Sequence, residues 1–255
     1  MLVLSKCLKC FTFDPYRLSK TQTMQLLLLS NSTIPGQPYL DWPKPLINRS
    51  LSEGTKAVFI PYAAVTFSYD EYEEMVSKAL AEVGVNVKSI HHSSDPVTSI
   101  QEAEAILVGG GNTFQLLSEL YRNGLVDPIR EKVKGGTPYI GWSAGSNVAC
   151  QSIKTTNDMP ITEPPTFDGL QLVNIQINPH YTEQTIVGHG GESRLQRLME
   201  YAAINDTPVL CLPEGCALKI EGDEWKLISS EPCKLIRKGG EVETLHHGVI
   251  SAIGE

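Results

Sequence analysis

A serine at the end of a short apolar run is the residue best placed to act as a nucleophile. Residues 139–142 are suited to a buried strand, and residues 141–145 read Gly-Trp-Ser-Ala-Gly. A sharp strand-to-helix turn at a Gly-x-Ser-x-Gly motif exposes the hydroxyl, here that of Ser143, and leaves no room for a Cβ on the flanking glycines. The amide of Ala144 then points to where an oxyanion would form. Alone, the motif fits a turn without chemistry equally well, so its context must decide.

A serine nucleophile needs a base, and the chain has six histidines. His180 follows residues 172–177, an alternating segment expected to be a strand that can neighbour the strand of Ser143. His180 is therefore the first candidate for the base, and His189, which lies among glycines, is the second. The base needs an acceptor that orients it, and two remain open: Asp158, on the loop after the serine's helix, and Glu214, at the end of a later strand.

A run of three glycines at 109–111 follows another apolar run and precedes a helical segment. The full dinucleotide and P-loop patterns are missing, which argues against a phosphate site. With a serine nucleophile nearby, the loop is better suited to supply a second oxyanion donor, with Gly111 as first choice and Gly110 as second.

Strand, loop and helix alternate along most of the chain, which predicts an α/β fold: a single doubly wound, mostly parallel sheet flanked by helices. Ligands of such sheets bind at the carboxyl ends of the strands. Residues 217–253 change to a β pattern with hairpin turns. We expect one catalytic domain at 24–255, with residues 1–23 outside it. The expected strands are 25–29, 56–61, 84–90, 105–108, 139–142, 172–177 and 208–213, and the expected helices 70–83, 97–103, 114–121 and 126–134.

Composition excludes several classes of function. The net charge of −8 over 255 residues argues against a nucleic-acid partner, and no apolar run is long enough to span a membrane. The six cysteines are scattered without a disulfide framework, which favours a reducing compartment such as the cytoplasm. Residues 1–23 lack the pattern of a secretory signal.

Six segments, in order along the chain, resemble the peptidase E family of α-aspartyl dipeptidases. The similarity runs from residue 24 to near the C-terminus. The segments are MQLLLLSNST at 24–33, VGGGNTFQL at 108–116, GWSAG at 141–145, TTNDMP at 155–160, INPH at 177–180 and LPEG at 212–215.

The resemblance implies a serine dipeptidase with a fold like that of class I glutamine amidotransferases, which is flavodoxin-like, acting on Asp-Xaa dipeptides. It assigns Ser143 as nucleophile, His180 as base and Asp158 as third member, with Glu214 as the alternative. The oxyanion donors would be Gly111 and Ala144. The family's substrate arginine falls at Arg194, whose planar guanidinium can hold a carboxylate bidentately, and Arg197 could share this task. The implied chemistry requires no metal and no cofactor.

Three other functions share part of this pattern. An α/β-hydrolase esterase shares the motif and residue order, but the short interval between Ser143 and His180 argues against it. A cyanophycinase-like β-aspartyl peptidase of the same clan is the closest rival. A non-catalytic binder of aspartyl metabolites is the rival from another class. The sequence leaves open whether the protein is a monomer or a homodimer.

Overall fold

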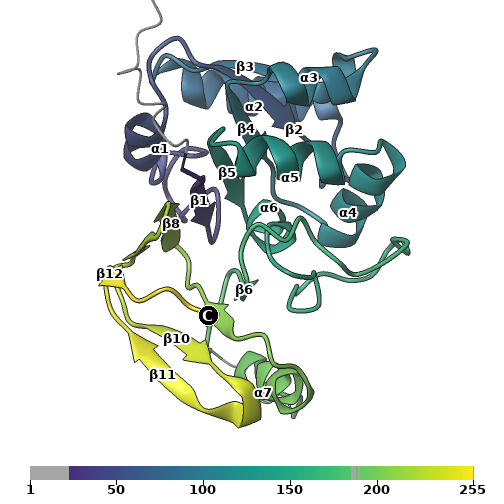
Figure 1. Cartoon of the computed structure of the whole chain (residues 1–255). Coiled ribbons are helices and arrows are strands. Elements are labelled where there is room, and N and C mark those ends of the chain that lie inside the picture. The colour runs from purple at the N-terminus through teal and green to yellow at the C-terminus, as the bar shows by residue number, and fades with distance from the viewer. Residues whose placement is uncertain (1–22, 185–187, 189, 255) are drawn as a thin grey trace, which may run out of the picture.

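The computed structural model describes residues 23–184, 188 and 190–254. Its larger sheet has eight strands in the order β12-β9-β8-β1-β5-β4-β2-β3 (Figure 1). The five strands from β1 to β3 in that order are mutually parallel, and β8, β9 and β12 extend the β1 edge in antiparallel fashion. The strands are β1 (Gln25–Leu29), β2 (Lys56–Ile60), β3 (Asn86–Ser89), β4 (Ala105–Val108), β5 (Tyr139–Trp142), β8 (Ala217–Glu221), β9 (Glu224–Ile228) and β12 (Gly248–Ile250).

Helices cover both faces of this sheet because its central strands are apolar on both sides. In β1, Leu26 and Leu28 pack into one core cluster, and Leu27 and Leu29 pack into another. The first cluster includes residues of α3 (Pro96–Glu102), α4 (Thr113–Arg122), α5 (Val126–Lys134) and α6 (Ala144–Val148). The second includes residues of α1 (Lys44–Ser50) and α2 (Tyr69–Ala81).

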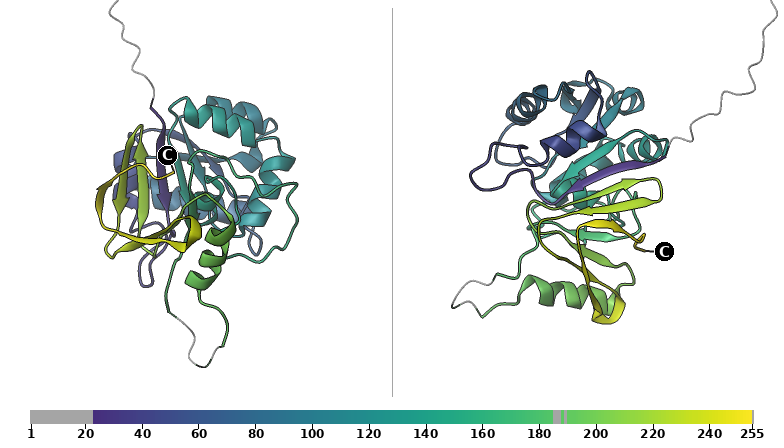
Figure 2. Two further views of the ribbon diagram at one scale, coloured as in Figure 1. Left: turned by 60° about the horizontal axis from the view of Figure 1, so that its bottom comes forward. Right: turned by 90° about the vertical axis from the view of Figure 1, so that its left-hand side faces the viewer.

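A second sheet of four strands, in the order β11-β10-β7-β6, lies beside the larger one. Its strands are β6 (Gln176–Asn178), β7 (Val209–Cys211), β10 (Cys233–Ile236) and β11 (Val242–Leu245). One face joins the larger core through Ile177, Leu210 and Leu235, and the other packs against α7 (Arg194–Ile204). Figure 2 shows this sheet and α7 projecting together from the main α/β body.

The α/β class, the parallel strands and the C-terminal hairpins are as predicted. Three details differ. The strands that precede His180 and Glu214 belong to the smaller sheet, so β6 does not pair with β5. Only the end of the expected strand at 172–177 is extended, since residues 172–175 form bends. Helix α1 was not anticipated. Among the described residues, no helix combines the length and apolar character that a membrane crossing needs.

Candidate active site

Ser143 occupies a strained turn between β5 and α6. Its backbone has φ 52° and ψ −112°, and its amide donates to the carbonyl of Leu29, 3.1 Å away, in the neighbouring strand. The flanking glycines are required: a Cβ on Gly141 would lie 2.4 Å from the Gly145 oxygen, and one on Gly145 would lie 2.2 Å from the Val108 oxygen. Positive φ at a non-glycine residue costs about 1–3 kcal/mol and is typical of functional positions.

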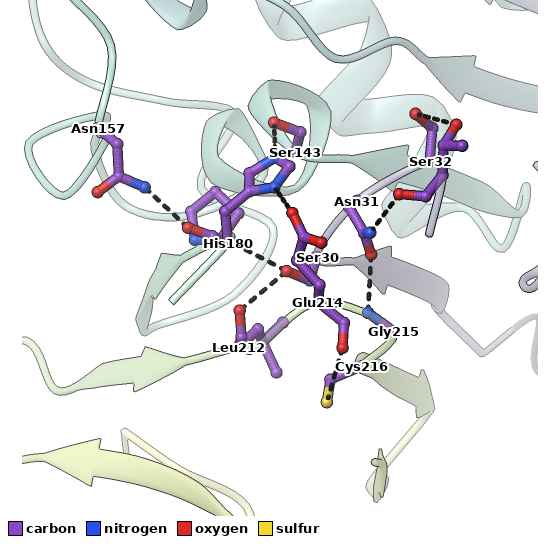
Figure 3. Close-up of polar contacts among 12 residues, drawn as sticks. Ser30, Asn31, Ser32, Ser143, Asn157, His180, Leu212, Glu214, Gly215 and Cys216 are labelled. Atoms are coloured by element: carbon purple, nitrogen blue, oxygen red, sulfur yellow. Dashed lines mark hydrogen bonds and ion pairs between the residues drawn. The ribbon is translucent and has the colours of Figure 1, made fainter. Parts of the chain in front are cut away.

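The imidazole of His180 lies against this serine. Its Nε2 is 2.8 Å from the Ser143 Oγ, although the two residues come from different sheets (Figure 3). Ser30, which directly follows β1, holds the histidine in place. Its hydroxyl accepts from the His180 amide at 2.8 Å and donates to the Leu212 carbonyl at 2.8 Å. Ser30 therefore connects the larger sheet to the loops that leave β6 and β7.

Glu214 is the carboxylate that contacts the imidazole. Its Oε1 lies 3.1 Å from the Nδ1 of His180. Glu214 follows β7, and the next amide, that of Gly215, donates to Asn31 Oδ1 at 2.9 Å (Figure 3). The Glu214 side chain is half exposed. Ser143, His180 and Glu214 thus form one continuous chain of contacts from hydroxyl to imidazole to carboxylate.

Asp158 lies elsewhere in the same pocket. Its Oδ2 accepts from the Thr113 amide at 2.7 Å, from the Thr113 hydroxyl at 2.6 Å and from the Thr156 hydroxyl at 2.9 Å. Thr113 is the first residue of α4, so the carboxylate sits at the positive end of that helix. No hydrogen bond between described residues joins Asp158 to His180. The structure therefore does not bring Asp158, the third member that the resemblance assigns, into contact with the imidazole. The start of α4 holds its carboxylate instead.

The glycine loop after β4 approaches the serine closely. A Cβ on Gly110 would lie 3.0 Å from the Ser143 Cβ, and Gly111 has φ 134° with no room beside the Ala63 oxygen. Within the described part of the chain, no acceptor pairs with the amides of Gly111 or Ala144. Both amides are thus available to a ligand beside Ser143.

Tyr72 braces this loop and was missed by the sequence analysis. Its hydroxyl donates to the Gly110 carbonyl at 3.0 Å and accepts from the Trp142 indole at 3.0 Å. Burial is the main cause of its raised pKa, so the phenol stays protonated. No local pattern marks this residue, because its partners lie on the loop after β4 and on β5. Ser30 and Asn31 could have been found, since they follow a central parallel strand at its carboxyl end.

The pocket around Ser143 has a volume of about 500 Å³. Its lining side chains fall into a polar and an apolar group, which we call the polar wall and the apolar wall. One wall is polar and includes Thr113, Thr156, Asn157, Asp158 and Arg194; the other is largely apolar and includes Tyr39, Phe67, Tyr72, Met75 and Trp142.

Arg194, the first residue of α7, is half-buried in the polar wall. Its Nη1 donates to the carbonyls of His180 and, at 3.4 Å, Pro179. No carboxylate among the described residues pairs with it, and desolvation lowers its pKa. Arg197, one turn on, is exposed and does not line the pocket. His189, the second candidate base, lies outside the described residues.

Comparison with known proteins identifies the relatives of this chain. The family model described as "Peptidase family S51" matches residues 26–228. A protein named "Peptidase E" from Shewanella sp. (strain W3-18-1) is 49% identical over 214 residues, which cover 84% of this chain and 91% of the relative. The "Peptidase E" of Salmonella typhimurium is 46% identical over 226 residues, which cover 88% and 99% of the two chains.

Two solved structures share the fold. The crystal structure of a putative peptidase E from Listeria monocytogenes has a TM-score of 0.56 and 25% identity, covering 84% of this chain and 98% of that one. A peptidase from an acI-B1 actinobacterium has a TM-score of 0.67 and 18% identity, covering 91% and 98%.

Proposed function

Because this chain belongs to peptidase family S51, we propose that it hydrolyses dipeptides that begin with aspartate, using Ser143 as the nucleophile and His180 as the base. The observation that carries this proposal is the chain of contacts at 2.8 Å from Ser143 Oγ to His180 Nε2 and at 3.1 Å from His180 Nδ1 to Glu214. In this proposal Glu214, rather than Asp158, orients the imidazole and stabilises its protonated form.

The reaction proceeds in two steps. His180 Nε2 accepts the Ser143 proton as Oγ attacks the peptide carbonyl carbon, and the amides of Gly111 and Ala144 donate to the developing oxyanion. His180 then gives the proton to the leaving amine, which departs as the second amino acid. Water, deprotonated by His180, attacks the aspartyl ester, and collapse of the second tetrahedral intermediate returns the proton to Ser143 and releases aspartate.

The polar wall provides opposite charges for the two charged groups of an N-terminal aspartate. Arg194 offers guanidinium N–H groups to the β-carboxylate. All three hydrogen bonds that the Asp158 carboxylate accepts fall on Oδ2, which leaves Oδ1 to accept from the α-ammonium group. An Asp158 contact of this kind predicts a preference for substrates with a free amino terminus.

The apolar wall suits the residue after aspartate. Tyr39, Phe67 and Met75 offer apolar and aromatic surface without a charged group, so many side chains fit there. Four cysteines, Cys150, Cys211, Cys216 and Cys233, are buried and free, which supports a reducing compartment such as the cytoplasm.

The test of this function is a panel of small peptides incubated with the full-length protein. We expect turnover of Asp-Leu and little or none of Glu-Leu, Ala-Leu, β-Asp-Leu and N-acetyl-Asp-Leu. Only Asp-Leu has its carboxylate one methylene away from the carbon that carries both the ammonium group and the scissile carbonyl. Cleavage of β-Asp-Leu alone would make the protein a β-aspartyl peptidase. Binding of these peptides without turnover of any would contradict the catalytic proposal and favour the binder.

Arg194→Lys should lower kcat/KM for Asp-Leu about 10- to 100-fold, mainly through KM, because loss of a bidentate charged contact costs about 1.5–3 kcal/mol. Inhibition by free aspartate should weaken by a similar factor and gives a readout that needs no chemistry. Arg197→Lys is the matched control, one turn away on the same helix, and should behave as wild type. If Arg197→Lys weakened aspartate inhibition and Arg194→Lys did not, the two roles would have to be exchanged.

A further inference from the structure

Two histidines and two carboxylates converge outside the catalytic pocket. Asp70 and Glu73 lie three residues apart at the start of α2, and His91 and His92 form the end of the short 3₁₀ helix η1 (Ile90–His92). One ligand atom from each of the four lies within 4.8 Å of the others. None of the four lines the pocket around Ser143, and the proposed hydrolysis does not use them.

The spacing of these donors suits a tetrahedral metal ion. His91 Nε2 is 2.9 Å from Asp70 Oδ1, and His92 Nε2 is 3.3 Å from the same oxygen and 2.8 Å from Glu73 Oε2. Bonds of about 2.1 Å at tetrahedral angles place neighbouring ligand atoms roughly 3.4 Å apart. The remaining pairs, which lie within 4.8 Å, would have to close by up to about 1.4 Å to reach this spacing, and rotation of partly exposed side chains can supply that movement.

Groups behind the ligands hold two of them in position. Ser89, which is buried, places its hydroxyl 2.6 Å from His91 Nδ1, and its amide donates to Glu73 Oε1 at 2.7 Å. A hydroxyl can donate or accept, so Ser89 can accept from Nδ1–H and leave Nε2 free for a metal. An outer partner on the second ring nitrogen is the usual companion of a metal-binding histidine. The carboxylate of Glu73 likewise keeps its second oxygen for a ligand.

We propose that Asp70, Glu73, His91 and His92 form a binding site for Zn²⁺ or a similar divalent transition-metal ion. Two neutral imidazoles and two carboxylates offset the charge of a divalent ion, and mixed nitrogen and oxygen donors favour zinc over calcium or magnesium. The site joins the start of α2 to η1 across the edge of the sheet. Because Tyr72 of the same helix braces Gly110, a bound ion would also restrain the helix that supports the glycine loop.

The test is zinc stoichiometry by competition with a chromogenic chelator, on full-length protein first stripped with EDTA. Wild type should bind one equivalent more than His91→Gln/His92→Gln. The matched control is His246→Gln/His247→Gln, which removes another adjacent pair and should keep the wild-type stoichiometry. Metal sites elsewhere in the chain contribute equally to all three proteins and cancel in the difference.

Two further measurements keep the result clear of folding effects. Asp70→Asn removes a charge from a side chain that is 75% exposed, so the variant should fold normally. Its Kd for zinc should nevertheless be at least tenfold higher than that of wild type. At zinc about 100-fold above its Kd, the Tm of wild type should rise by about 5 °C more than that of His91→Gln/His92→Gln. Equal stoichiometry in wild type and His91→Gln/His92→Gln, or an equal loss in the His246→Gln/His247→Gln control, would overturn the proposal.

Discussion

Ser143→Ala should lower kcat for Asp-Leu by about 10⁵- to 10⁶-fold, since loss of a serine nucleophile removes the covalent route and leaves only binding and oxyanion stabilisation. The folded protein should keep its stability. Ser143 precedes α6 without capping it through its side chain, and among the described residues its hydroxyl contacts only His180, so alanine removes little that holds the fold together. Single-turnover assays of Asp-Leu and thermal melting of both proteins measure the two effects.

The matched control is Ser68→Ala. Ser68 precedes α2 and, unlike Ser143, caps its helix through its side chain, in a capping box with Glu71. Its hydroxyl accepts from the Glu71 amide, and the Glu71 carboxylate accepts from the Ser68 amide. Its loss should cost about 1 kcal/mol of stability and leave kcat within a few-fold. Ser143→Ala should therefore lower kcat and leave stability unchanged, whereas Ser68→Ala should lower stability and leave kcat nearly unchanged. A Ser143→Ala protein that retained more than about a hundredth of the wild-type kcat would exclude a serine mechanism.

The parts of the fold that the sequence predicted are those set by local pattern. Buried parallel strands produce continuous apolar runs such as residues 25–29 and 105–108, and these were identified with nearly the observed limits. The turn at Ser143 was predictable for the same reason, since the glycines that allow it are its neighbours. Helix α1 was missed because Pro43 and Pro45 interrupt the polar and apolar pattern; both lie at its start, where proline is tolerated.

Contacts between residues that are far apart in the sequence could not be predicted from local pattern. His180 was expected on a strand beside that of Ser143, and instead it reaches the serine from the smaller sheet. Its position depends on Ser30, which is 150 residues away in the chain. Contacts at such separation leave no periodic signal in a single sequence. Its place after an expected strand made His180 the first candidate for the base, and the resemblance to a family assigned it the same role, but neither indicated this route to the serine.

The choice between Asp158 and Glu214 shows the same limit. Asp158 follows the serine's helix and precedes His180, and the resemblance assigned it as third member with Glu214 as the alternative. In the fold, its loop runs to the start of α4, where Thr113 and Thr156 satisfy its Oδ2. Glu214 is distant in sequence, but β6 and β7 are parallel neighbours, so the residues after them meet at one edge of the smaller sheet. Strand pairing therefore selects the acid that reaches the imidazole.

Glu214→Gln should lower kcat for Asp-Leu by about 10²- to 10⁴-fold with a small change in KM. A neutral amide cannot stabilise the imidazolium, and it can present its NH₂ group to Nδ1 and favour the wrong tautomer. The half-exposed side chain places the expected loss toward the lower end, since water shares the stabilisation of the imidazolium. Asp158→Asn is the matched control: its carbonyl oxygen can still accept from Thr113, so the fold is kept while the charge is lost.

The two variants should separate by kinetic parameter as well as by size. Asp158→Asn removes the proposed partner of the substrate ammonium and should raise KM about tenfold or more, with a smaller effect on kcat. Glu214→Gln should act on kcat, because its partner is the imidazole and not the substrate. The reverse pattern would restore Asp158 as the orienting acid and would require its loop to leave Thr113 when substrate binds. Three hydrogen bonds to Asp158 would have to break in that movement, two of them at the start of α4, and this cost is the physical reason for assigning the role to Glu214.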